Sequence, residues 1–128
     1  MIVLDSDVMI DILRQYPPAM EWLKLLGEEE IVLPGFVMME LMQGCRNKAE
    51  QNRIEKIVTS FAIVWPLPDS CNVALSLFAN YHLSHDVGLL DVLIAQTAVS
   101  LNLPLYTFNQ KHYSMIPGLT IIEPYKRV

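Results

Sequence analysis

The sequence predicts an α/β protein, a three-layer sandwich in which helices flank a parallel sheet of five strands. Short runs of Ile, Val and Leu alternate with longer segments of helical character, which is typical of a parallel sheet with a helix between successive strands. The runs are apolar throughout, as expected for strands that helices cover on both faces. The chain has 128 residues, of which 52% are hydrophobic, enough for one sizeable core. We therefore expect a single domain over residues 1–128.

The first half of the chain supplies two strands and four helices. The run at 2–4 is followed by Asp-Ser-Asp, which indicates a helix N-terminus, and apolar residues recur at helical spacing until Pro17-Pro18 ends that helix. A glycine closes the second helix, Pro34-Gly35 ends the second strand, and Gly44 suits the end of the third helix. The expected strands are 2–4 and 31–33. The expected helices are one from about residue 8 to the prolines at 17 and 18, and then 19–26, 36–43 and 48–60.

The second half supplies the remaining elements. A β-branched and aromatic run is stopped by Pro66 and Pro68, and Asp69-Ser70 is suited to cap the helix that follows. The next helix is apolar on nearly every side. The expected strands are 61–65, 105–107 and 119–122, and the expected helices are 69–83 and 89–101.

Four polar residues stand at the edges of these apolar elements: Asp5, Glu40, Asp91 and Asn109. Asp91 is the most informative, because its helix is otherwise apolar and a buried carboxylate needs donors, a cation or a metal. Asp5 and Asn109 directly follow strands, and Glu40 lies on a helix that follows one. Ligands of parallel sheets bind beyond the carboxyl ends of the strands. Three acids gathered there would repel one another unless a divalent cation lay among them, so the pattern predicts an acid-lined metal site.

Each of these residues also has an ordinary structural explanation. Ser6 or Asp7 would cap the first helix, which leaves Asp5 free for another task. Glu40 would be exposed on the outer face of its helix, and Asp91 would favour a helix N-terminus through the macrodipole. Asn109 would be a turn residue. The prediction of a metal site therefore rests on the four residues taken together.

Composition limits the classes of function. No apolar run approaches the roughly 18 residues that span a bilayer, and the first residues lack a signal peptide, so we expect no membrane association and a cytoplasmic location. Cys45 and Cys71 are isolated and are expected to be free thiols. The net charge of −5 does not by itself suggest a nucleic-acid binder.

Taken in order, five segments resemble the PIN domain family, and in particular the VapC-type toxins of toxin–antitoxin pairs. No single segment is decisive, but their order and spacing cover essentially the whole chain. The segments are Ile2-Val3-Leu4-Asp5-Ser6-Asp7-Val8, Met39-Glu40-Leu41-Met42-Gln43-Gly44, Gly88-Leu89-Leu90-Asp91-Val92-Leu93-Ile94-Ala95, Leu105-Tyr106-Thr107-Phe108-Asn109-Gln110-Lys111-His112-Tyr113 and Ile116-Pro117-Gly118-Leu119.

The resemblance implies a metal-dependent ribonuclease that hydrolyses RNA phosphodiester bonds. It implies that Asp5, Glu40 and Asp91 bind Mg²⁺ or Mn²⁺ and are the catalytic residues. Asn109 stands where the family often has a fourth acid, and it would add a neutral carbonyl ligand, so a second metal would be held more weakly. Ser6 and Thr107 would support the carboxylates by hydrogen bonds. The family's toxins act as homodimers and are silenced by a partner antitoxin.

Two other functions stay open at this point. The Asp5-Ser6-Asp7-Val8 segment also resembles the phospho-aspartyl motif of haloacid-dehalogenase-type phosphatases, although this chain lacks a convincing Gly-Asp…Asp loop and a cap domain. The other is a PIN-like domain that binds RNA or protein and has lost turnover because residue 109 is Asn. RNA cleavage, phosphomonoester hydrolysis and RNA binding distinguish the three functions.

Overall fold

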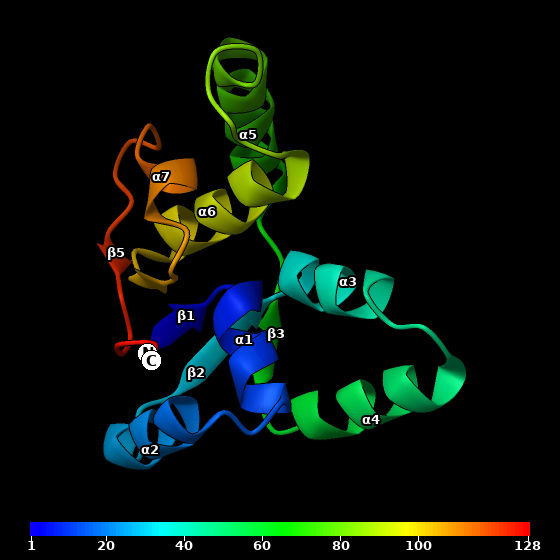
Figure 1. Ribbon diagram of the computed structural model, residues 1–128. Coiled ribbons are helices and arrows are strands. Elements are labelled where there is room, and N and C mark those ends of the chain that lie inside the picture. The colour runs from blue at the N-terminus through cyan, green and yellow to red at the C-terminus, as the bar shows by residue number, and fades with distance from the viewer.

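The computed structural model describes residues 1–128 and confirms the predicted class, because five parallel strands form one sheet flanked by helices (Figure 1). The strand order is β3-β2-β1-β4-β5, so β1 is the central strand. The strands are β1 (Ile2–Leu4), β2 (Ile31–Pro34), β3 (Ala62–Val64), β4 (Leu105–Tyr106) and β5 (Ile121–Ile122).

Seven helices accompany the sheet, one more than the sequence predicts. They are α1 (Ser6–Leu13), α2 (Pro17–Leu26), α3 (Gly35–Gln43), α4 (Lys48–Val58), α5 (Pro68–Tyr81), α6 (Leu89–Leu101) and α7 (Gln110–Tyr113). The additional one, α7, is a single turn after β4.

Two prolines have a different role from the one expected. Pro17 and Pro18 begin α2, whereas α1 already ends at Leu13 and the chain turns at Gln15, whose φ is 55°. Proline suits the first turn of a helix because the amides there have no partner within the helix. The N-cap of α5 also differs, since it is Leu67, with Pro68 in the first turn, and not Asp69 or Ser70.

The strand β1 is covered on both faces. Its residues Ile2, Val3 and Leu4 are at most 4% exposed, and because successive side chains point to opposite sides of a sheet, both sides must be packed. Helix α6 buries an unbroken run of residues, Ile94–Ala98, and also Val92. None of the helices has both the length and the apolar character needed to cross a bilayer.

The strand order fixes where a site forms. From β1 the chain crosses to β2 on one side, while β4 pairs with β1 on the other, with Val3 opposite Leu105. The carboxyl ends of β1 and β4 thus meet at a topological switch point, the usual place for ligands in open α/β sheets. Asp5 follows β1, Thr107 follows β4, and α3 follows β2, so all three predicted segments reach this edge.

Packing of the central strands should dominate stability. Leu33 on β2 is fully buried, whereas Leu75 on α5 is 67% exposed. We predict that Leu33→Ala lowers the free energy of unfolding by about 2–5 kcal/mol, because it leaves a cavity in the core. The same change at Leu75 should alter it by less than about 0.5 kcal/mol. Urea unfolding followed by circular dichroism measures both values, and equal losses would contradict this account of the core.

Candidate metal centre

Asp5 is buried, 2% exposed, and both of its carboxylate oxygens accept hydrogen bonds. Oδ1 accepts the backbone N–H of Ser6 at 2.7 Å, while Oδ2 accepts the hydroxyl groups of Thr107 and Tyr113, each at 2.8 Å. Asp5 is itself the N-cap of α1, the position that we expected Ser6 or Asp7 to fill. The residue therefore joins the start of α1 to β4 and α7.

Ser6 connects Asp5 to Glu40. Its Oγ donates to Glu40 Oε1 at 3.2 Å and lies 3.4 Å from Asp5 Oδ1. Because α1 and α3 follow neighbouring parallel strands, this hydroxyl spans the gap between the two helices. Glu40 is half-buried and faces this edge of the sheet, so the expectation of an exposed residue on the outer face of α3 is wrong.

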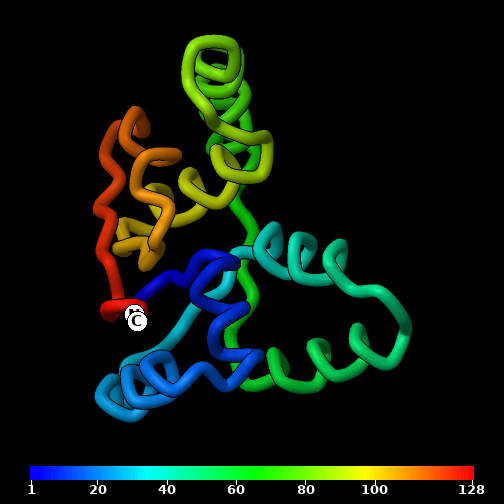
Figure 2. Tube along the Cα trace, in the orientation of Figure 1, coloured from blue at the N-terminus to red at the C-terminus, as the bar shows by residue number.

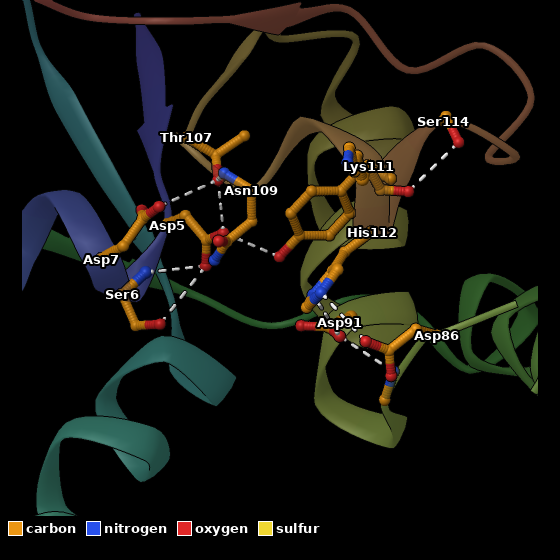
Figure 3. Close-up of polar contacts among 12 residues, drawn as sticks. Asp5, Ser6, Asp7, Asp86, Asp91, Thr107, Asn109, Lys111, His112 and Ser114 are labelled. Atoms are coloured by element: carbon orange, nitrogen blue, oxygen red, sulfur yellow. Dashed lines mark hydrogen bonds and ion pairs between the residues drawn. The ribbon is translucent and has the colours of Figure 1, made fainter. Parts of the chain in front are cut away.

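Asp91 stands in the first turn of α6, on the other side of the centre (Figure 3). Its Oδ2 accepts the N–H of Gly88 at 2.8 Å, so Asp91 also caps its own helix. His112 lies between two carboxylates, with Nδ1 3.6 Å from Asp91 Oδ2 and Nε2 3.5 Å from Asp86 Oδ2.

Thr107 and Asn109 follow β4. Thr107 is fully buried, and its Oγ1 accepts the backbone N–H of Asn109 at 3.0 Å while its hydroxyl donates to Asp5. The Asn109 side chain is exposed, and this residue precedes α7. Thr107 thus supports Asp5 directly, as the resemblance implies, whereas Asn109 contacts the centre through its backbone.

Two residues of the site were missed from the sequence. Asp7 Oδ2 accepts the N–H of Phe108 at 2.8 Å and holds the segment after β4 against α1. Tyr113 is buried and donates to Asp5. The segment Gln110–Tyr113 carries mostly polar residues and forms only one helical turn, too short for a periodic pattern. A signal for Asp7 was present in Asp5-Ser6-Asp7, but we interpreted it as a helix cap.

The carboxylates raise one another's pKa. Burial raises the pKa of Asp5, the hydrogen bonds from Thr107, Tyr113 and Ser6 oppose this, and the charge of Asp91 adds to it. Burial and then the charge of Asp5 raise the pKa of Glu40, and the same two causes raise the pKa of Asp7 to about 6. No lysine or arginine forms an ion pair with Asp5, Glu40 or Asp91.

The donor chemistry of this centre suits a hard divalent cation. The donors at this edge of the sheet are carboxylate oxygens, which Mg²⁺ and Mn²⁺ prefer. No lysine or arginine is paired with them to offset their repulsion. As the side chains lie, no three His, Cys, Asp or Glu residues come close enough together to hold one ion. Asp5, Glu40 and Asp91 nevertheless surround the same edge of the sheet and influence one another electrostatically. Joint coordination therefore requires side-chain rotation.

Residues 2–116 match the family model described as the PIN domain. The chain belongs to the PIN domain family. This PIN domain is 33% identical over 122 residues to "Ribonuclease VapC19" of Mycobacterium tuberculosis (strain ATCC 25618 / H37Rv), an alignment that covers 91% of this chain and 95% of the relative. The membership of the PIN domain family that the five segments predicted is thus confirmed.

Solved structures of similar chains come from toxin–antitoxin complexes. A chain of VapBC-1 from nontypeable Haemophilus influenzae superposes with a TM-score of 0.75 at 26% identity, covering 96% of this PIN domain and 98% of that chain. A chain of a toxin-antitoxin complex from Klebsiella pneumoniae gives a TM-score of 0.77 at 24% identity, with 99% and 100% covered. The second comparison supports the fold alone.

The raised pKa values make the stability of the metal-free protein depend on pH. A carboxyl group whose pKa is higher in the folded state retains its proton there, so unfolding becomes easier as pH rises. For Asp7 the window runs from the ordinary value of 3.8 to about 6. We predict that, with EDTA present, the free energy of unfolding falls across this window by on the order of 1–3 kcal/mol.

The test is urea unfolding at pH values between 4 and 7. Asp7→Asn should flatten the profile, since the amide still accepts the bond from Phe108 but does not titrate. Asp69→Asn, at an exposed position in the first turn of α5, serves as the control and should retain the fall. Stability that increases with pH through this window would contradict the charge repulsion inferred for the centre.

Proposed function

We propose that this PIN domain is a metal-dependent endoribonuclease and the toxin of a toxin–antitoxin pair. The similarity to "Ribonuclease VapC19", which extends over 91% of the chain, supports the activity. The similarity to a chain of VapBC-1 from nontypeable Haemophilus influenzae, at 26% identity, supports the biological role. The observation that carries the proposal is the buried Asp5 carboxylate at the switch point, with Glu40 and Asp91 around it and no lysine or arginine paired with any of the three.

The reaction is hydrolysis, in which water adds to the phosphorus of an RNA phosphodiester and a ribose oxygen leaves. Asp5, Glu40 and Asp91 are the residues proposed to hold Mg²⁺ or Mn²⁺, with the Asn109 carbonyl as a neutral fourth ligand. The bound ion supplies positive charge at the scissile phosphate. One of the three carboxylates also orients the attacking water.

The surrounding residues position these carboxylates. Thr107 and Tyr113 both donate to Asp5 Oδ2, while the Ser6 amide donates to Oδ1 at 2.7 Å, and these bonds restrain the carboxylate. Ser6 orients Glu40, and the Gly88 amide orients Asp91. Such supporting hydrogen bonds typically change metal affinity or activity 10- to 100-fold.

The proposed partners are RNA, an antitoxin protein and a second copy of the chain, and the proposed location is the cytoplasm. Large apolar side chains on the surface are consistent with protein association. Among them, Trp65 is 55% exposed, Leu67 72% and Leu83 89%.

Substitution of the carboxylates tests the activity. We predict that Asp5→Asn and Asp91→Asn each reduce cleavage of a labelled RNA by at least about 100-fold, because each removes a ligand charge. Asp69→Asn is a matched control, since Asp69 and Asp91 both lie in the first turn of a helix. Cleavage that survives both substitutions would refute the proposal.

The same assay distinguishes the other two functions. RNA binding without turnover under any divalent metal would favour a non-catalytic PIN-like module. Asn109 is the reason for this alternative, because it is uncharged where the family often has an acid. Release of phosphate from small phosphomonoesters would favour a phosphatase.

Metal binding is tested without turnover by thermal unfolding. We predict that Mn²⁺ or Mg²⁺ raises the melting temperature at neutral pH relative to EDTA, because a cation relieves the carboxylate repulsion. At 100 times its dissociation constant, the ion would stabilise the fold by about 2.7 kcal/mol. Glu40→Gln should reduce this shift and Asp69→Asn should not, and an identical shift in both variants would remove Glu40 from the ligand set.

A further inference from the structure

Tyr125 and Arg127, which follow β5, contact parts of the molecule that flank the carboxylate centre. The ring of Tyr125 packs against Tyr16 and Trp22 at α2, with 6.4 and 5.8 Å between ring centroids, and against Phe108 at 5.1 Å. Figure 2 shows the red end of the chain running from β5 to the side of α2, in agreement with these contacts. We call Tyr125 and Arg127 together the clasp.

Arg127 joins helix α1 to the segment that follows β4. Its Nε lies 3.1 Å from Asp11 Oδ2, the oxygen that also accepts the Tyr125 hydroxyl at 2.7 Å. Its guanidinium lies over the Phe108 ring, 3.9 Å from the centroid, and one terminal nitrogen lies 3.5 Å from the backbone carbonyl of Asp7. The Asp11 side chain is only 14% exposed. One arginine side chain therefore contacts α1 and Phe108 at the same time.

Phe108 lies where the chain leaves the sheet. Thr107 still bonds to β5, because its N–H donates to the carbonyl of Ile122 at 3.0 Å. The next two amides bond to side chains instead, that of Phe108 to Asp7 Oδ2 at 2.8 Å and that of Asn109 to Thr107 Oγ1 at 3.0 Å. The position of Phe108 therefore depends on side-chain contacts, among them those that the clasp makes with its ring.

The two neighbours of Phe108 in the chain belong to the proposed metal centre. Thr107 donates to Asp5 Oδ2 at 2.8 Å, and Asn109 is the proposed neutral ligand. Because both are bonded to Phe108 through the backbone, a shift of Phe108 would move them. Arg127 itself contacts Asp11, Phe108 and the backbone of Asp7, so its effect on the geometry of the centre passes through these residues.

We propose that Arg127 is a positioning residue of the metal centre, which holds Phe108 against α1 and thereby keeps Thr107 and Asn109 in place beside Asp5. This inference rests on the proposed function, because it concerns the residues that bind and support the metal.

The two residues of the clasp differ in what they contribute to folding. Tyr125 packs against three aromatic rings, so its loss would destabilise the fold as well as move Phe108. The side chain of Arg127 is 45% exposed, and ion pairs of partly exposed side chains add little to stability. Substitution of Arg127 therefore tests positioning with the smaller effect on folding.

The charge of Arg127 acts in the opposite direction to its contacts. Burial and then the charge of Asp5 raise the pKa of Asp7, whereas the charge of Arg127 lowers it, so this charge reaches the centre. A protein cation beside carboxylates opposes the binding of a metal ion, and its removal alone would strengthen that binding. Loss of positioning would weaken it. The sign of the change in metal affinity therefore distinguishes the two effects.

The test is the affinity of the protein for Mn²⁺ in the absence of RNA, measured from the electron paramagnetic resonance signal of the free ion. We expect Arg127→Gln to weaken Mn²⁺ binding by about tenfold, the lower end of the range for residues that support metal ligands. Arg127→Lys keeps the charge but lacks the planar group that stacks on Phe108, and it should be weakened as well. Unchanged or tighter binding in Arg127→Gln would overturn the inference.

Lys126→Gln is the matched control. It removes the same charge one residue away, where the side chain is 90% exposed and pairs with Glu123, and it should bind Mn²⁺ as the wild type does. In EDTA, Arg127→Gln and Lys126→Gln should melt at nearly the same temperature. If Arg127→Gln melts much lower, Arg127→Lys, which can still pair with Asp11, decides the question, and wild-type affinity in that variant would contradict the inference.

A double-mutant cycle tests whether Arg127 acts through Phe108. Phe108→Leu keeps an apolar side chain but removes the ring under the guanidinium. If the effect passes through this ring, Arg127→Gln should weaken Mn²⁺ binding in the wild-type background and have little further effect in the Phe108→Leu background. An undiminished loss of affinity in the second background would show that Arg127 acts by another route, and the inference would fail.

Deuterium exchange of single backbone amides distinguishes failure of this inference from failure of the proposed function. In the metal-free protein, the amides of Phe108 and Asn109 should exchange several times faster in Arg127→Gln than in Lys126→Gln. If the wild type binds no Mn²⁺ and cleaves no RNA, the proposed function fails, and this exchange still decides whether Arg127 holds the segment. Equal exchange in the two variants would refute the positioning role even where the wild type is an active ribonuclease.

Discussion

The buried carboxylate of Asp5 is the point on which the organisation of this PIN domain depends. Two hydroxyl groups more than 100 positions away in the sequence, those of Thr107 and Tyr113, donate to the same oxygen, and the other oxygen receives the first amide of α1. A charge taken out of water at such a site costs several kcal/mol unless donors surround it. The three donors come from α1, from the end of β4 and from α7. Stabilising this one group therefore fixes the relative positions of three segments.

The fold class and most elements could be predicted because their signals are local. Apolar runs of three or four residues marked β1 and β2, and the all-apolar α6 could be recognised from its composition. The order of the strands across the sheet was not predictable in this way, because it depends on contacts between distant residues. The turn of helix at Gln110–Tyr113 was missed for the same reason, since tertiary contacts of Tyr113, and not helical periodicity, hold it in place.

The site was also only partly predictable, since its residues had local signals and the contacts between them did not. That Asp5 and Glu40 lie at one edge follows from their places after parallel strands, whereas the position of Asp91, on a helix that follows another helix, was expected only from its apolar surroundings and the family pattern. Their partners do not follow, because the sequence could not say that Ser6 links Asp5 to Glu40 or that His112 lies between Asp86 and Asp91. The interpretation of Asp5 as released from capping was wrong, because φ and ψ at the end of β1 place Asp5 itself at the N-cap.

Two of these acids both cap a helix and belong to the proposed metal site, which changes how related sequences should be compared. Asp5 caps α1 and Asp91 caps α6, so both contribute to folding whether or not a metal is ever bound. Glu40 lies within α3, away from its N-terminus, and its side chain accepts a hydrogen bond from the Ser6 hydroxyl. In a related protein without catalytic activity, selection for stability would still retain the two capping acids, whereas residue 40 could be replaced. Among homologues, residue 40 is therefore the better marker of a working enzyme than either aspartate.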